Sequence, residues 1–361
     1  MRKIKNIATL LLFLLLFIFT FTSCSNNSKI EDITKTNTTH DIVDLSNRNV
    51  TLPTSINRVA TLMGPAYEKV FMLGGSDSII LTNKATSTLP WAVKTNPKIS
   101  NIPTVTTANN PNTEELLNAK TQVVFFWNFE EPIKAMNNSH IPVIVVASST
   151  DITNVDEYVQ REKDTLMTYA NVLGEDAIKK ANKWNDYFDQ KIKYVTSRTK
   201  SLTADEIKSV YYASSKDGFE CFTKNSAVQF LLEIAGGTLI SKDIDTGSYA
   251  NVTMEQIIAW NPNVIFTGRM TSSDLIYNDT KWSSLAAVKN KDVITSPMGV
   301  MYWDGSTECP LLLEYMAKSL HPELFTDLDM VKEVKEYYKE FYSYDLNDDN
   351  ANRILNHLDP A

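Results

Sequence analysis

The sequence predicts an α/β fold of two Rossmann-like lobes, joined by a single long helix, with a ligand cleft between them. Short runs rich in β-branched residues alternate with helical segments on both sides of that helix. Such alternation is typical of parallel sheets with helices on their faces. Paired glycines end a helix at 71–75 and again at 233–237, and a helix-then-strand phrase at 113–125 recurs at 253–266. These echoes indicate a duplicated lobe.

The joining helix is predicted over residues 175–203. Its apolar residues recur every three or four positions, which marks one face of a helix: Ala177, Ala181, Trp184, Phe188, Ile192 and Val195. Glu175 and Asp176 in the first turn suit the positive end of a helix dipole. No glycine or proline interrupts the stretch, so the helix could extend for roughly 40 Å.

The lobes are predicted from strand-length apolar runs and the helical segments between them. The first lobe has strand runs at 58–63, 78–83, 123–127 and 143–148, with helices at 67–73, 112–119 and 132–138. The second has strand runs at 209–214, 264–268 and 292–296, with helices at 226–235, 253–259, 308–320 and 329–342. The runs carry few charges, as strands buried on both sheet faces do. Because ligands bind beyond the carboxyl ends of parallel strands, the loops after these runs should line the cleft.

Composition excludes some partners. The 361 residues include 35 basic and 43 acidic side chains, for a net charge of −8. An acidic balance disfavours nucleic acid and anionic membrane surfaces as partners. The 43% hydrophobic and 22% charged content is that of a globular protein.

The N-terminus has the features of an export signal. Arg2, Lys3 and Lys5 precede an apolar run at 7–21 that is short for a membrane span. The run ends in a segment that resembles a bacterial lipobox, with Phe21 where that pattern prefers Leu and with Cys24 as the lipidated residue. An uncleaved anchor, or an ordinary signal with an incidental cysteine, are the alternatives. We expect an exported protein, lipid-anchored at the extracytoplasmic face of the cell membrane.

The expected domain limits follow from these segments. They are a lipoprotein signal at 1–24, a flexible tether at 25–40, a first lobe at 41–155, a linking helical segment at 156–203 and a second lobe at 204–361. The tether is rich in Ser, Asn, Thr and Lys, which favours a flexible chain.

Cysteine and histidine usage leaves little scope for a resident metal. Cys221 and Cys309 could form a disulfide in an exported protein, remain as two buried thiols, or serve as soft metal ligands. The four histidines are scattered at His40, His140, His321 and His357, whereas a bare transition metal wants several converging ligands. We therefore expect no metal site and no cofactor, and any metal should arrive already chelated.

Several phrases resemble a known family. These are 44–53 (DLSNRNVTLP) followed by 58–60 (RVA), then 68–74 (EKVFMLG), 255–265 (EQIIAWNPNVI) and 282–293 (WSSLAAVKNKDV). Together with an export signal and two lobes on one helix, they resemble the class III substrate-binding lipoproteins of ABC importers, which serve iron–siderophore complexes, haem and cobalamin. The resemblance implies a cleft site, slight lobe closure, and an ABC permease with its ATPase subunits as partners.

Aromatic residues gather at the strand ends that should face the cleft. We expect ligand contacts from Tyr67, Trp91, Trp127, Tyr212, Tyr249, Tyr302 and Trp303, with Phe129 and Phe219 nearby. Aromatic walls suit a bulky, partly apolar ligand. Ordinary core packing is the alternative for each of these residues taken alone.

Charges and sulfurs near the same loops add further candidates. Arg269 and Lys84 follow strand runs and could meet an anionic chelate, although either could equally be a solvated surface charge. Met298 and Met301 could be soft contacts or packing. The resemblance implies one acidic docking residue per lobe, for which Glu68 and Glu255 are the candidates, while the alternative is a carboxylate that favours a helix start.

Enzymatic chemistry lacks support in this sequence. It contains no G-x-S-x-G elbow, Walker loop, H-E-x-x-H pair or G-x-G-x-x-G turn after a strand. Asp304–Glu308 looks like an active-site segment but also reads as a helix cap. We therefore expect a non-enzymatic, monomeric receptor that captures an iron(III)–siderophore-type chelate and delivers it to a permease. The alternatives are cobalamin, haem or a nickel chelate as cargo, or a surface adhesin.

Overall fold

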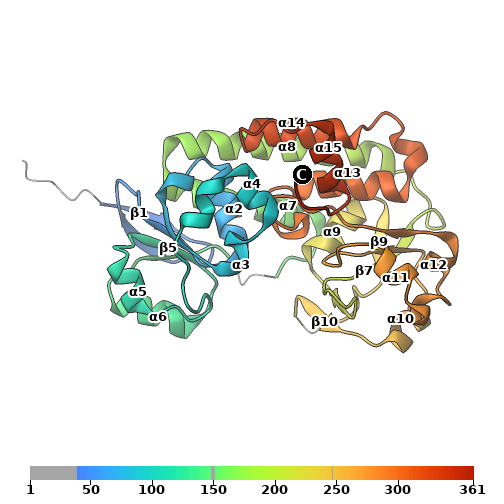
Figure 1. Ribbon diagram of the computed structural model, residues 1–361, viewed down its shortest axis with the longest axis horizontal. Helices are drawn as coiled ribbons and strands as arrows, with labels where there is room; N and C mark the ends of the chain where they lie inside the picture. The colour runs from blue at the N-terminus through green and yellow to red at the C-terminus, as the bar shows by residue number, and fades with distance from the viewer. Residues whose placement is uncertain (1–38, 148–150, 246) are drawn as a thin grey trace, which may run out of the picture. The chain divides into compact units, whose positions relative to one another are not determined.

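Two four-stranded parallel sheets form the framework of this protein (Figure 1). The computed structural model describes residues 39–147, 151–245 and 247–361. The first sheet has the order β4-β3-β5-β6, built from β3 (Val59–Thr61), β4 (Ile79–Thr82), β5 (Val123–Phe126) and β6 (Val143–Val145). The second has the order β12-β11-β7-β9, built from β7 (Lys208–Tyr212), β9 (Gly237–Leu239), β11 (Val264–Phe266) and β12 (Val293–Ile294). The predicted α/β class is confirmed.

Both sheets use the same strand order. When the four strands of each sheet are numbered along the chain, they lie across the sheet in the order second, first, third, fourth, starting from β4 in the first sheet and from β9 in the second. The duplication indicated by the sequence echoes is therefore present in the topology. The paired glycines also match, because Gly74 and Gly236 follow equivalent helices with φ values of 85° and 82°. A left-handed residue after a helix favours glycine, which explains why this phrase occurs twice.

The strands are apolar because both of their faces are covered. In β5, Val123 and Phe125 pack into one hydrophobic cluster, while Val124 and Phe126 pack into another on the opposite face of the sheet. Successive side chains of a strand point to opposite faces, so a doubly covered strand reads as an unbroken apolar run. Every predicted strand run contains a strand, although β9 was missed, since it begins within the glycine pair and has no apolar run of its own.

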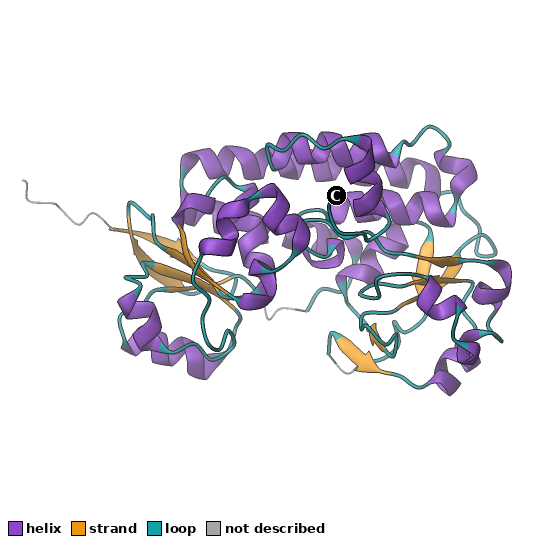
Figure 2. Cartoon of the chain, viewed as in Figure 1, coloured by secondary structure: helices purple, strands orange, loops and turns teal. Residues whose placement is uncertain are grey.

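Helices cover the sheets (Figure 2). On the first-lobe side they are α2 (Gly64–Met72), α3 (Lys84–Ser87), α4 (Pro90–Thr95), α5 (Thr113–Asn118) and α6 (Glu130–Asn138). On the second-lobe side they are α9 (Ala227–Ile234), α10 (Met254–Trp260), α11 (Asp274–Tyr277), α12 (Ala286–Asn290), α13 (Cys309–Leu320), α14 (Met330–Phe341) and α15 (Asp348–Leu355). Each predicted helix is present. Two antiparallel pairs are added, β1 (Thr39–Val43) with β2 (Asn49–Pro53), and β8 (Glu220–Phe222) with β10 (Tyr249–Asn251).

The linking segment contains the predicted long helix and a second helix that precedes it. Helix α7 (Val155–Leu173) precedes α8 (Glu175–Thr199), and Gly174, at φ 102°, reverses the chain between them. Helix α8 begins beside the first lobe, where Lys180 lies against Gly74, and ends at the second, where the Thr199 hydroxyl donates to Ile234 O at 2.8 Å. The predicted linking helical segment at 156–203 covers both helices, although only the stretch after Gly174 was predicted as the long joining helix.

The end of the chain returns to the first lobe. The indole of Trp91 in α4 donates to Leu358 O at 3.0 Å, and Lys94 donates to Ala361 O at 3.0 Å. The domain limits drawn from the sequence stay predictions. The signal, Cys24 and nearly all of the tether lie outside the described residues, and no helix within the described ranges is long and apolar enough to cross a membrane.

Candidate ligand-binding site

A cavity of about 380 Å³ opens where the two lobes meet α7. From the first lobe it is lined by Met63, Pro65, Lys69, Trp127, Val146 and Ala147, and from the linker by Ile152, Tyr158, Arg161, Glu162, Thr165 and Tyr169. The second lobe contributes Phe222, Asn225, Ser226, Ala227, Ser248, Tyr249, Asp304, Gly305, Ser306 and Cys309. The cavity therefore lies at the junction where a cleft was predicted.

Lys69 is the most buried cation of this cavity. It lies in α2 with 6% of its surface exposed, and its ammonium donates to Gly305 O at 3.3 Å. Within the described part of the chain it forms no ion pair. An ammonium has three donors, so this lysine keeps unused donors next to the cavity. A buried charge without a direct counter-ion is costly, and an anion in the cavity would offset that cost.

Asp304 is held by groups from the second lobe. Its carboxylate pairs with Arg269 at 3.1 Å and accepts from the Tyr212 hydroxyl at 3.3 Å. The Arg269 guanidinium also lies 4.3 Å from the centroid of the Tyr302 ring, in cation–π geometry. Arg269 thus neutralises Asp304. The other charged residues of the lining are two cations, Lys69 and Arg161, and one carboxyl group, Glu162.

Glu162 is a carboxyl group of the lining whose pKa is raised. Burial raises its pKa, and the opposing attraction of Lys69 and Arg161 is smaller. Desolvation disfavours the charged form of a carboxyl, so Glu162 becomes neutral at a higher pH than an exposed glutamate. When neutral, it would no longer offset the positive charge of Lys69 at the cavity.

Neutral donors complete the lining. The helix α9 begins at the cavity, where Ser226 is its N-cap and accepts from Gln229 N at 3.3 Å. The first N–H groups of a helix have no partner within the helix and carry partial positive charge. Hydroxyls of Thr165, Ser248 and Ser306 stand around the same space.

The predicted ligand residues divide into three groups. Trp127, half-buried, and Tyr249, 43% exposed, line the cavity. Arg269 and Tyr302 are not part of the lining; Arg269 pairs with the lining residue Asp304 and lies over the Tyr302 ring. Tyr67, Trp91, Tyr212 and Trp303 are buried to 2% exposure or less and do not line it, so for them core packing applies.

The core roles of those residues have specific causes. The Tyr67 hydroxyl accepts from Asn96 Nδ2 at 3.0 Å, and Tyr212 stacks on Phe266 with ring centroids 6.2 Å apart. The four buried aromatic side chains point into the apolar layer between sheet and helices, where their volume fills the close-packed core. The secondary candidates Lys84, Phe129, Phe219, Met298 and Met301 also lie outside the cavity lining.

Glu68 is wrong as a docking residue, because it is completely buried. Its carboxylate accepts from Thr307 N at 3.1 Å, from the Thr307 hydroxyl and from the Tyr342 hydroxyl at 2.6 Å. A group without exposed surface cannot meet a permease in this conformation. Glu255, in contrast, is exposed in the first turn of α10.

The two cysteines are free, buried thiols, which answers the question that the sequence left open. Burial raises the pKa of both thiols. Cys221 lies in β8 and Cys309 begins α13 at the cavity wall. Among the described residues, no group of three or more His, Cys, Asp or Glu side chains could hold a metal ion.

Sequence reasoning missed the polar residues of the site. Lys69, Tyr158, Arg161 and Glu162 all belong to helices that were treated as framework. A usable signal was present for Lys69, because Pro65 marks the start of α2 directly after a strand, and the first turns of such a helix face the strand ends. The α7 residues carry no comparable local signal.

A family model for periplasmic binding proteins matches residues 59–298. The chain belongs to the periplasmic binding protein family. The molybdate-binding protein MolA of Haemophilus influenzae is 27% identical over 337 residues, covering 86% of this chain and 93% of MolA. The structure of MolA bound to molybdate has a TM-score of 0.77 and 23% identity, with 85% of this chain and 99% of that chain covered.

Two other relatives agree with this assignment. YvrC of Bacillus subtilis, an uncharacterised ABC transporter substrate-binding lipoprotein, is 24% identical over 300 residues, covering 79% of this chain and 87% of YvrC. A periplasmic solute-binding protein from Veillonella parvula has a TM-score of 0.76 and 25% identity, with 88% of this chain and 97% of that chain covered. The resemblance to class III binding proteins is confirmed, and this periplasmic binding protein is a non-enzymatic, extracytoplasmic carrier of an ABC importer.

Proposed function

We propose that this protein captures a small tetrahedral oxyanion of the molybdate class outside the cytoplasm and delivers it to an ABC permease. The observation that carries the proposal is Lys69, a buried ammonium at the cavity without an ion pair in the described part of the chain. Arg161, the start of α9 and the surrounding hydroxyls add donors on other sides. The relationship to MolA supports the same class of cargo.

The size of the cavity is compatible with a small ligand. Its volume of about 380 Å³ is at the lower end of the range of roughly 300–1,000 Å³ that ligand pockets have. A tetrahedral oxyanion with surrounding waters would fit in it. A haem or cobalamin has several times as many heavy atoms, so these cargoes would require a much wider opening between the lobes.

An iron(III)–siderophore-type chelate remains the second candidate. It is favoured by Trp127 and Tyr249, aromatic side chains that come to the cavity from different lobes. A ferric chelate would use these rings as walls, whereas a bare oxyanion needs only the donors. The two cargoes therefore predict different sensitive residues.

The anchor and the docking site are also proposals. Lipidation at Cys24 would hold the protein on the membrane as a monomer, and the lipoprotein relative YvrC supports this. For docking to the permease we retain Glu255, which is exposed on α10. In the duplicated plan α5 corresponds to α10, and Glu114 is the exposed acid in its first turn. Glu114 therefore replaces Glu68 as the first-lobe candidate.

The cargo is tested by calorimetric titration of the full chain in detergent. Molybdate, tungstate, sulfate, phosphate, a ferric hydroxamate, a ferric catecholate and haemin would be compared. We expect micromolar or tighter binding of molybdate or tungstate, and a loss of at least about tenfold in Lys69→Met, since a buried ion contact is removed.

The matched control is Lys84→Met, because Lys84 is an exposed lysine of the first lobe outside the cavity lining. It should bind as the wild type does. Binding of the ferric chelates alone would replace the oxyanion with the second candidate. If no compound of the panel binds, the cargo proposal is wrong while the family assignment stands.

A further inference from the structure

Tyr158 carries a hydroxyl group that the folded chain leaves without a hydrogen bond of good geometry. The residue lies in the first turns of α7 and is 1% exposed. Its ring stacks on Phe230 with centroids 5.6 Å apart and meets the edge of Phe188 at 6.5 Å. Within the described residues its oxygen has no hydrogen-bond partner of good geometry, and the neighbouring Cys309 thiol offers only a weak contact. Buried polar groups are nearly always satisfied, so this one calls for an explanation.

Tyr158 belongs to the lining of the cavity. Cys309 and Glu162, which act electrostatically on its hydroxyl, line the same cavity. Phe230 and Phe188 hold the ring itself. The aromatic packing thus fixes the side chain, and its buried oxygen lies among residues of the cavity wall.

The group is a hydrogen-bond donor throughout the physiological range. Burial raises the pKa of Tyr158 well above its usual value, with smaller contributions from Cys309 and Glu162. A phenol that stays protonated can donate to an acceptor, and an oxyanion offers only acceptors. A hydrogen bond to a charged oxygen is among the stronger ones in proteins.

Resting on the oxyanion cargo proposed above, we propose that Tyr158 is a ligand-binding residue whose hydroxyl donates a hydrogen bond to an oxygen of the bound anion. The unsatisfied hydroxyl is then the donor that an oxygen of the anion would occupy. Lys69, from the first lobe, would attract the anion by its charge, and Tyr158, from the linker, would orient it through a hydrogen bond. The linker helix is therefore part of the binding site as well as of the framework.

The chain contains a matched control for this residue. Tyr187 in α8 also has a buried hydroxyl without a hydrogen-bond partner in the described ranges. It lies in a different groove, between α8 and α14, together with Lys183, Glu336 and Phe341. Changing either tyrosine to phenylalanine removes the same atom, but only one of the two atoms lies at the proposed site.

The test compares Tyr158→Phe and Tyr187→Phe in the full chain, with sodium molybdate as the probe. Calorimetric titration should show a Kd raised roughly tenfold or more in Tyr158→Phe and unchanged in Tyr187→Phe. Thermal melting without ligand should show no loss of stability in either variant, because each loses only an unsatisfied group. A merely structural role for Tyr158 would instead lower the melting temperature.

The outcomes separate this inference from the cargo proposal. Tight molybdate binding by the wild type with an unchanged Kd in Tyr158→Phe would overturn the role of Tyr158 and leave the oxyanion cargo standing. Failure of the wild type to bind any oxyanion would overturn both. A loss of affinity accompanied by a lower ligand-free melting temperature than that of Tyr187→Phe would also count against a direct contact.

Discussion

Glu68 and Glu308 bring two carboxyl groups into the interior at the start of α13. Glu68 comes from α2 and bonds to Thr307, while Glu308 accepts from the Tyr338 hydroxyl at 2.7 Å and from Met301 N at 3.2 Å. Both residues are 0% exposed. Thr307 and Glu308 are neighbours in the chain, so the two carboxyl groups influence each other across the junction of the lobes.

The first prediction concerns the pH dependence of folding. Burial, and secondarily the charge of Glu68, raise the pKa of Glu308 to about 8. The unfolded chain has this carboxyl at its ordinary value near 4.3, so between these limits the folded state binds more protons and loses stability as pH rises. The melting temperature should fall between pH 5 and pH 8.

The variant Glu308→Gln serves as the check on that assignment. It keeps the volume and an acceptor oxygen but cannot ionise, so its melting temperature should depend less on pH over the same interval. Scanning calorimetry at several pH values would measure this. Equal slopes in the wild type and the variant would show that Glu308 is not the responsible group.

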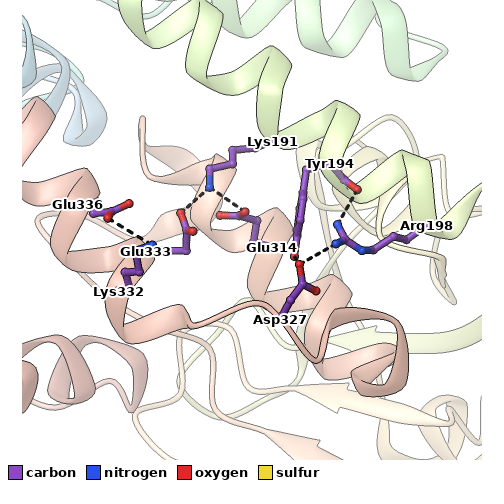
Figure 3. A network of polar contacts seen from close by, with 8 residues as sticks. All are labelled: Lys191, Tyr194, Arg198, Glu314, Asp327, Lys332, Glu333 and Glu336. Atoms are coloured by element: carbon purple, nitrogen blue, oxygen red, sulfur yellow. Dashed lines mark hydrogen bonds and ion pairs between the residues drawn. The ribbon is translucent and has the colours of Figure 1, made fainter.

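At the scale of elements, a charged cluster holds α8 to the last helices (Figure 3). Lys191 of α8 pairs with Glu314 of α13 at 2.9 Å and also with Glu333 of α14. Burial raises the pKa of Glu314 to about 7, against the attraction of Lys191. Farther along α8, Arg198 pairs with Asp327 at 2.8 Å and lies over the Tyr194 ring. Helix α8 is thus fastened along its length.

The second prediction is that Lys191→Met destabilises the protein by about 3 kcal/mol. The change would leave Glu314 and Glu333 facing each other without their shared cation in a half-buried place. Lys179→Met is the control, since Lys179 pairs with Asp176 on the solvent-exposed side of the same helix and should show no measurable effect. Urea unfolding curves would compare both variants, and equal midpoints would contradict the prediction.

At the scale of the whole molecule, several connections restrain the two lobes. They are joined by α7 and α8, by the contact of Glu68 with Thr307, and by the return of the chain end to Trp91. These bonds lie on different elements, so a large rotation would break several of them at once. The slight closure implied by the family resemblance has a physical reason here.

The third prediction follows from these restraints. Addition of a saturating oxyanion should change the radius of gyration of the protein by less than about 1 Å, as measured by small-angle X-ray scattering. Glu68→Ala removes the acceptor for Thr307 and should enlarge that change. A change of several ångströms in the radius of gyration of the wild type would show that these connections break when the ligand binds.

The sequence by itself determined the class of fold, the duplicated plan, the long helix and the family. These depend on local periodicity and on short phrases, such as the glycine pairs and the strand runs, whose cause lies within a few residues. It also placed Trp127 at the cavity, because residues after parallel strands share one edge of a sheet, and Tyr249 from its position near the Gly247 turn.

Only the tertiary structure decided which polar groups face the cavity. Tyr67, Glu68 and Lys69 are consecutive on α2, yet the first packs in the core, the second bonds to Thr307 and the third reaches the cavity. Their separation depends on what α7 and α13 place against each side of that helix, which no pattern within α2 records. Tyr158 is the same case, since its hydroxyl is unsatisfied only because of neighbours that are distant in sequence.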